Sequence, residues 1–155
     1  GNALRMASAR FLAEFHRNPP LQRELYRYTH TLMAQISQTA ACNRFHVVEQ
    51  RLARWLLMTH DRLRSAQFRM THEFLGHMLG VRRVGVTKAA QVLQERKLIR
   101  YSRGRITVTD RPGLEREVCE CYAVVKAETD RLLPYLPEAE AAVPVRPKPA
   151  PRAKR

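Results

Sequence analysis

Residues 71–93 read THEFLGHMLGVRRVGVTKAAQVL and contain the most specific structural pattern in the chain. Thr71 is a good helix N-cap and predicts a short helix over 72–79. Gly80 can end that helix, because glycine tolerates the left-handed conformation common at helix stops. A second helix is expected over about 82–96. Two helices joined by so short a turn predict a helix-turn-helix.

The second helix has two distinct faces. Its apolar positions predict a buried side made of Val86, Ala89, Ala90 and Leu93, and its opposite side shows Arg83, Val84, Thr87, Lys88 and Gln91. The recognition helix of a helix-turn-helix enters the DNA major groove with its N-terminal residues at the base edges. We therefore expect Arg83 to form a bidentate hydrogen bond with guanine and Lys88 to reach a base or a phosphate. Thr87 and Val84 are expected to contact thymine methyl groups. Taken alone, Arg83 or Lys88 is more often an ordinary solvated side chain. Their position on the helix that follows the glycine turn favours a contact with DNA instead.

A basic hairpin follows the two helices. Residues 98–101 alternate as a strand, Ser102-Arg103-Gly104-Arg105 forms a tight basic turn, and 106–108 return. This hairpin completes a winged helix-turn-helix. Thr71 and the amide of His72, at the positive end of the first helix, suit a phosphate. Arg82, Arg103 and Arg105 are expected to hold phosphates as well.

Helices are predicted on both sides of this unit. A short helix around 11–15 precedes Asn18-Pro19-Pro20, and a long helix over 20–42 carries a narrow apolar stripe consisting of Leu21, Leu25, Tyr28, Leu32 and Ile36. Such a seam suits contact between two identical helices, although it could instead pack on its own domain. A helix over 47–63 places Trp55 in the core. After Asp110, one continuous last helix is expected to run to about residue 133.

The charge of the chain is strongly uneven. The whole sequence has a formal charge of +14, and residues 62–105 contain eleven Lys and Arg against two Asp and Glu. A solvated surface usually intersperses acids among its bases, so this local excess favours a polyanionic partner such as nucleic acid. The last ten residues add five further positive charges, and the Ala- and Pro-rich composition from residue 138 predicts disorder.

Signals for catalysis or metal binding are weak. His72 and His77 are five residues apart, which does not match the His-x-x-x-His spacing of helical metal sites. Cys119-x-Cys121 with the single remote Cys42 lacks the paired spacing of a zinc site. The cysteines are therefore interpreted as reduced thiols in a cytoplasmic protein, and neither a catalytic residue, a metal nor a cofactor is predicted. No apolar run is long enough to span a membrane.

These motifs together resemble the Crp/Fnr family of bacterial regulators. Residues 42–44 (CNR) and 49–57 (EQRLARWLL) resemble the junction between that family's dimer helix and DNA-binding domain. Residues 74–83 (FLGHMLGVRR) and 98–106 (LIRYSRGRI) resemble its helix-turn-helix and wing. The likeness covers roughly residues 4–133. It implies a homodimer that binds an inverted-repeat operator, and an N-terminal β-roll effector domain in the full protein.

The resemblance assigns base-reading positions to Arg83 and Lys88 and a phosphate position to Thr71. The sequence departs from the family at Val84, where the best-known members carry a glutamate that reads cytosine.

RNA polymerase is a further candidate partner. Winged helices also serve as protein-binding modules, so an acidic protein partner is the alternative.

The expected organisation is mainly α with a β wing. The predicted parts are an expression scar at 1–3, a short helix and dimerisation helix at 4–43, a winged helix-turn-helix domain at 44–136 and a basic tail at 137–155.

Overall fold

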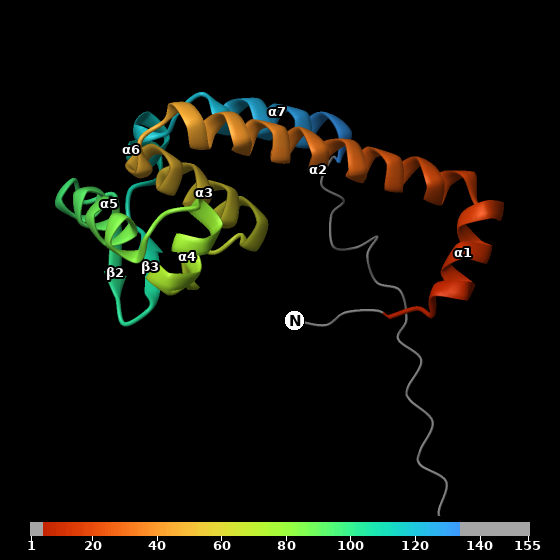
Figure 1. Cartoon of the computed structure of the whole chain (residues 1–155), viewed down its shortest axis with the longest axis horizontal. Helices are drawn as coiled ribbons and strands as arrows, with labels where there is room; N and C mark the ends of the chain where they lie inside the picture. The colour runs from red at the N-terminus through yellow and green to blue at the C-terminus, as the bar shows by residue number, and fades with distance from the viewer. Residues whose placement is uncertain (1–4, 134–155) are drawn as a thin grey trace, which may run out of the picture.

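The computed structural model describes residues 5–133 (Figure 1). The expected scar and the expected basic tail therefore lie outside the described residues. The elements in chain order are α1 (Ser8–Arg17), α2 (Pro19–Phe45), α3 (Val48–Leu63), β1 (Gln67–Arg69), α4 (His72–Leu79), α5 (Arg83–Glu95), β2 (Ile99–Ser102), β3 (Arg105–Val108), α6 (Arg111–Glu117) and α7 (Cys121–Leu132). The predicted fold class, mainly α with a β wing, is confirmed. No helix within 5–133 combines the length and apolar character needed to cross a membrane.

The long helix α2 extends away from the smaller elements, which gather at its C-terminal end (Figure 1). It begins at the two prolines, where Asn18 Oδ1 accepts a hydrogen bond from the Leu21 amide at 3.1 Å. This cap explains why α1 and α2 meet at an angle instead of forming one helix. At its other end α2 runs to Phe45, one turn beyond the predicted end near Cys42, and stops where the backbone of His46 becomes extended.

The hydrophobic core lies between α3, α4, α5 and one face of the small sheet. Its largest fully buried side chains include Leu52, Leu56, Leu57, Leu75, Leu93 and Ile106. Trp55 lies at the edge of this core as predicted, with its ring edge-on to Phe74 at a centroid distance of 5.8 Å. Burial of this apolar surface is the main force that fixes α4 and α5 against α3.

The sheet has three antiparallel strands in the order β1-β3-β2. Ile106 pairs with Phe68 on one side and with Tyr101 on the other. Phe68 and Ile106 are buried, whereas their neighbours along each strand face outward, so the alternation predicted for the hairpin is confirmed. The outward face of the sheet is therefore free to carry polar and charged residues.

The prediction of one continuous helix after Asp110 was wrong. Asp110 does cap a helix, since its Oδ1 accepts from the Gly113 amide at 2.9 Å, but α6 ends at Glu117 and Val118 is extended. Cys119 and Cys121 are both buried although only two residues apart, which a straight surface helix would not allow. The break lets α7 turn and lie alongside α2 (Figure 1).

A polar network stabilises the position of α6 and α7 on α3. Arg111 lies 2.7 Å from Asp61 Oδ1, and the Tyr122 hydroxyl donates to Asp61 Oδ2 at 2.7 Å. Burial, together with hydrogen bonding to the charged Asp61, raises the pKa of the Tyr122 hydroxyl. Tyr122 therefore stays protonated and keeps the donor that this network needs.

Candidate nucleic-acid interface

The helix-turn-helix is built as the sequence predicts. The Thr71 hydroxyl oxygen accepts from the Phe74 amide at 3.1 Å, and Gly80 adopts a left-handed φ of 63° at the end of α4. The four residues predicted to form the inner face of α5 are all buried. One supporting contact was missed: the buried guanidinium of Arg51 on α3 donates to the Leu79 carbonyl oxygen, at the negative end of α4.

The outer face of α5 is open to solvent. Arg83, Val84, Thr87 and Lys88 are all exposed, and Val84 retains 59% of its accessible surface. Arg82 lies just outside the helix as its N-cap, so its side chain starts beside the first turn of α5.

His72 is placed differently from the other predicted phosphate residues. Its ring stacks on Tyr101 of β2 with centroids 4.1 Å apart, and its Nδ1 lies 2.9 Å from the Thr87 hydroxyl oxygen. Because Thr87 donates its own proton to the Arg83 carbonyl at 3.0 Å, His72 Nδ1 is the donor in the contact between them. The imidazole therefore positions Thr87, and only the backbone amide of His72 remains to face a phosphate.

The pKa of His72 is lowered, first by burial and then by the positive charge of Arg83. Its Nε2 is buried and has no hydrogen-bond partner among the described residues. A second proton on this ring would place a charge in a poorly solvated position beside a cation. His72 is thus held in its neutral form, in which it bridges α4, α5 and β2.

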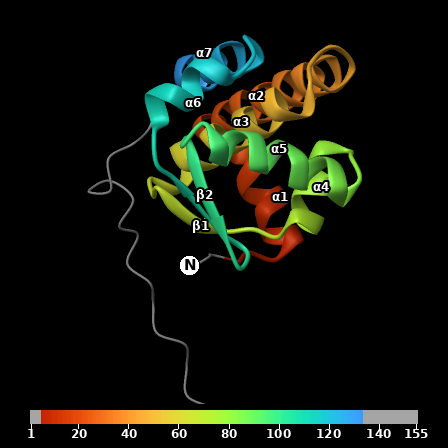
Figure 2. The same cartoon turned by 90° about the vertical axis from the view of Figure 1, so that its left-hand side faces the viewer.

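The wing places its basic turn next to the start of α4. Arg103 and Gly104 both have positive φ values, 48° and 74°, as a two-residue hairpin turn requires. Arg103 lines a depression together with Thr71 and Arg69, so two predicted phosphate residues are brought together there. Figure 2 shows the hairpin and α5 on the same side of the domain.

Sequence reasoning missed two arginines of this surface. Arg69 on β1 and Arg100 on β2 join Arg103 and Arg105 around a second depression, on the outward face of the sheet. The alternation of β2 could have identified Arg100, because it lies between the inward-facing Ile99 and Tyr101. Arg69 was hidden because β1 is only three residues long.

The cations of this surface differ from several others in the chain in having no acidic partner. Within residues 5–133, Arg96, Arg111, Lys126 and Arg131 each form an ion pair with an acidic side chain. The described residues provide no such partner for Arg69, Arg82, Arg83, Lys88, Arg100, Arg103 and Arg105. Unpaired, exposed positive charges concentrated on one face form an attractive field for a polyanion.

The predicted dimer seam on α2 is partly exposed. Tyr28, Leu32 and Ile36 are exposed at intervals of four residues, while Leu21 and Leu25 are half-buried. α7 packs elsewhere on the same helix, where Thr31 and Cys42 are buried. The described residues therefore leave Tyr28, Leu32 and Ile36 of this stripe uncovered.

Comparison with known proteins agrees with the geometry. The model of a Crp-like helix-turn-helix domain matches residues 50–117. No curated protein matches. A solved structure from Eubacterium rectale, assigned to the Crp/Fnr family of transcriptional regulators, is 22% identical with a TM-score of 0.54. The alignment covers 68% of this chain and 49% of that one, so the chain spans about half the length of that relative.

The catabolite activator protein of Thermus thermophilus is also similar. It is 21% identical with a TM-score of 0.38, over 74% of this chain and 52% of that one. The family match falls on the segment that contains α4, α5 and both strands of the wing. Residues 50–117 therefore form a Crp-like helix-turn-helix domain.

Proposed function

We propose that this chain belongs to a bacterial transcription regulator that binds double-stranded DNA in a sequence-specific manner and acts in the cytoplasm. The observation that carries the proposal is the exposed N-terminal half of α5, which carries two cations and is flanked by five more, all seven without acidic partners within the described residues. An α-helix fits the major groove, and the wing beside it can reach the adjacent backbone.

In this proposal the exposed residues of α5 contact bases, and the residues around α5 contact phosphates. Arg83, Val84, Thr87 and Lys88 face the bases, and Arg83 supplies the bidentate contact to guanine. Both polar contacts of the Thr87 hydroxyl are already made, to Arg83 and His72, so its methyl group is what remains for a thymine. Val84 has no hydrogen-bond acceptor and favours an apolar contact with the base it meets.

Phosphate contacts would fix the register of the complex. Thr71 uses its oxygen lone pair to cap α4 but keeps its hydroxyl proton, which can be donated to a phosphate oxygen. Arg82, Arg103 and Arg105 reach the backbone on either side of the recognition helix. Arg69 and Arg100 extend this basic surface across the wing.

The regulator would act as a homodimer through α2 and bind an inverted repeat. Tyr28, Leu32 and Ile36 form an exposed apolar row that a second copy of the same helix can cover. A two-fold axis through that contact presents two copies of α5 to successive major grooves of the same duplex. Contact with RNA polymerase would follow DNA binding and is a further part of this proposal.

Selection of binding sites from a random duplex pool, at about 0.15 M salt, tests the proposal. A two-fold-symmetric motif with half-sites about one helical turn apart is the expected result. Binding with no preference among sequences would reject sequence-specific regulation. Tight binding to an acidic protein together with no binding to duplex DNA would instead support the protein-interaction alternative.

A further inference from the structure

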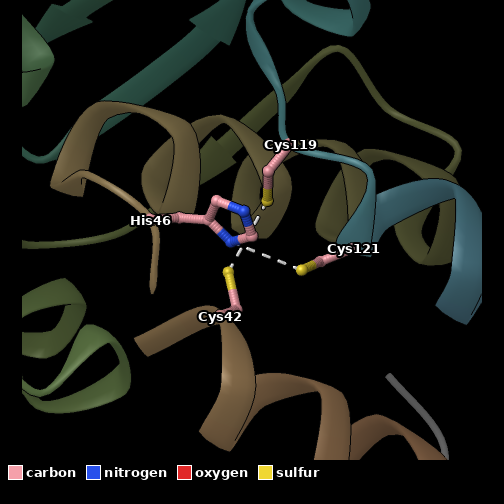
Figure 3. Close-up of side chains that lie close together, drawn as sticks. All are labelled: Cys42, His46, Cys119 and Cys121. Carbon is pink, nitrogen blue, oxygen red and sulfur yellow. Dashed lines mark hydrogen bonds between the residues drawn. The ribbon is translucent and has the colours of Figure 1, made fainter. Parts of the chain in front are cut away.

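Three cysteines and one histidine from two distant parts of the chain converge at the junction of α2 and α3. Cys42 lies in the last turn of α2 and His46 is its C-cap. Cys119 lies in the break between α6 and α7, and Cys121 is the first residue of α7. Figure 3 shows the three sulfur atoms and the imidazole ring turned toward a common centre. Their ligand atoms all lie within 4.8 Å of one another.

Two of the distances match those in the coordination shell of one tetrahedral ion, and all the ligand atoms lie within 4.8 Å of one another. The sulfur atoms of Cys42 and Cys119 are 3.6 Å apart, and Cys121 Sγ lies 3.5 Å from His46 Nδ1. Zn–S bonds of about 2.3 Å and Zn–N bonds of about 2.0 Å place tetrahedral ligands about 3.7 Å and about 3.5 Å apart. Iron–sulfur clusters distribute their ligands over several metal atoms and need more space.

The groups around the four residues orient them as metal ligands. His46 Nε2 lies 3.2 Å from the Glu120 carboxylate, which fixes the proton on Nε2 and leaves the Nδ1 lone pair facing the sulfurs. The Gln38 amide nitrogen donates to Cys121 Sγ at 3.1 Å. A carboxylate behind a ligating histidine is a recurring support of metal sites.

A buried positive charge next to the cluster supplies an independent argument. Arg54 is only 6% exposed, and its only hydrogen bond among the described residues is to the Thr39 hydroxyl oxygen, 3.1 Å away. Buried charges normally have a partner of opposite sign. A zinc ion with three thiolates has a net charge of −1, and Arg54 lies close enough to Cys42 to act on its charge.

We propose that Cys42, His46, Cys119 and Cys121 bind one zinc ion. Three thiolates and one imidazole complete its shell, which leaves no open position for a substrate, so the ion is structural. It joins the C-terminal end of α2 to the α6–α7 junction. It also accounts for the interrupted helix at Val118, because the chain must leave the helical path there to bring Cys119 and Cys121 to the same centre.

The sequence spacing of the cysteines gave the opposite expectation. A Cys-x-Cys pair and a lone cysteine 77 residues away do not match any paired zinc motif. The second half of the site is Cys42-x-x-x-His46, in which the two ligands are one helical turn apart at the end of α2. Folding brings the two halves together.

Metal analysis of the purified 155-residue chain tests the proposal, with purification that avoids metal-affinity resin and strong chelators. We expect one zinc per chain and three thiols that become reactive only after the metal is released. A metal-free chain with three free thiols, or one with a disulfide between two of them, would overturn the proposal. One iron per chain would overturn the assignment to zinc.

Paired variants locate the ion. Glu120→Gln keeps all four ligands and should weaken zinc binding about 10- to 100-fold in a competition with a chromophoric chelator. Glu24→Gln, on the first turns of α2, should leave the affinity unchanged. His46→Asn should release the ion more readily, whereas His30→Asn on the same helix should not. Unchanged zinc affinity in both Glu120→Gln and His46→Asn would refute this location. Zinc stoichiometry is independent of DNA affinity, so this proposal can fail or succeed apart from the proposed function.

Discussion

Gly76 on α4 faces the carbonyl oxygen of Val81 so closely that a Cβ atom added to Gly76 would lie 2.9 Å from that oxygen. The same carbon would approach the backbone nitrogen of Arg83 at 3.7 Å. The close approach of α4 to the start of α5 therefore depends on the missing side chain. The turn that presents the recognition helix is set by this contact.

Gly76→Ala should destabilise the chain by about 1–3 kcal/mol, because the backbone oxygen cannot move without shifting α5. Gly85→Ala is the matched control: its Cβ would meet only Val81 side-chain carbons at 3.8 and 3.9 Å, an ordinary contact. Since alanine is the better helix former, Gly85→Ala should be neutral or stabilising by up to about 1 kcal/mol. Urea denaturation of the two variants measures the difference, and equal stabilities would contradict the steric argument.

Arg83→Ala should weaken binding to the selected operator by about 1–3 kcal/mol and relax the preference at one base position. Arg96→Ala is the control, because Arg96 lies at the far end of α5 in an ion pair with Glu117. Fluorescence anisotropy on the operator and on singly substituted duplexes gives both quantities. An equal loss on every duplex would make Arg83 a phosphate contact.

Arg100→Ala should weaken binding to all duplexes alike and lower the slope of log affinity against log salt by about 1. The reason is that an outward-facing wing arginine can neutralise a phosphate but has no base edge within its reach. Lys126→Ala on α7 is the control, since that lysine pairs with Asp130. A salt slope identical to that of the unmodified chain would exclude Arg100 from the interface.

The lowered pKa of His72 predicts a loss of stability in acid. The unfolded chain takes up the proton near pH 6.5, the usual value for histidine, whereas folded His72 takes it up only at lower pH. Stability is thus unaffected by His72 well above that value and is lost as the pH falls from 6.5 toward the pKa of the folded form. His72→Phe keeps a ring against Tyr101 and should flatten the decline of unfolding free energy between about pH 7.5 and about pH 5. His77→Phe, on the exposed side of α4, should leave the decline unchanged, and identical curves for the two variants would disprove the role of His72.

Leu32→Asp should convert the proposed homodimer into monomers, because a carboxylate in the apolar seam would be buried without a partner. Ser37→Asp adds the same charge to an exposed position elsewhere around α2 and should leave the dimer intact. Light scattering measures the mass of both. A mass that does not change with Leu32→Asp would reject this face as the interface.

Local signals in the sequence determined most of the helix-turn-helix domain. The Thr71 cap, the Gly80 stop and the alternation of residues 98–108 each act within a few residues, and helix α4 has the bounds predicted for it. The buried face of α5 follows from its helical period alone. The structure agrees in these places because local preference and tertiary packing favour the same conformation.

The sequence was less informative where contacts between distant residues determine the local structure or the burial of a side chain. Nothing near Val118 forbids a helix, and the break arises from where Cys119, Cys121 and α7 pack. The amide of His72 was assigned to a phosphate because its position at a helix start was visible in the sequence, whereas the contacts of its side chain with Tyr101 and Thr87 were not. Arg51 and Arg54 resembled ordinary surface charges because their burial depends on α4 and α2, which no local pattern reveals.

The packing of α7 against α2 also sets an order of folding. Most of the core can collapse early, since all of its buried residues apart from Tyr122 lie within residues 52–114. The long helix made before it must wait for the last one, because their contacts join residues such as Gln38 and Cys121, 83 positions apart. Contacts of such long range form late and at an entropic cost. A chain that stops near residue 118 would therefore keep most of the helix-turn-helix core yet leave α2 without the neighbour that orients it.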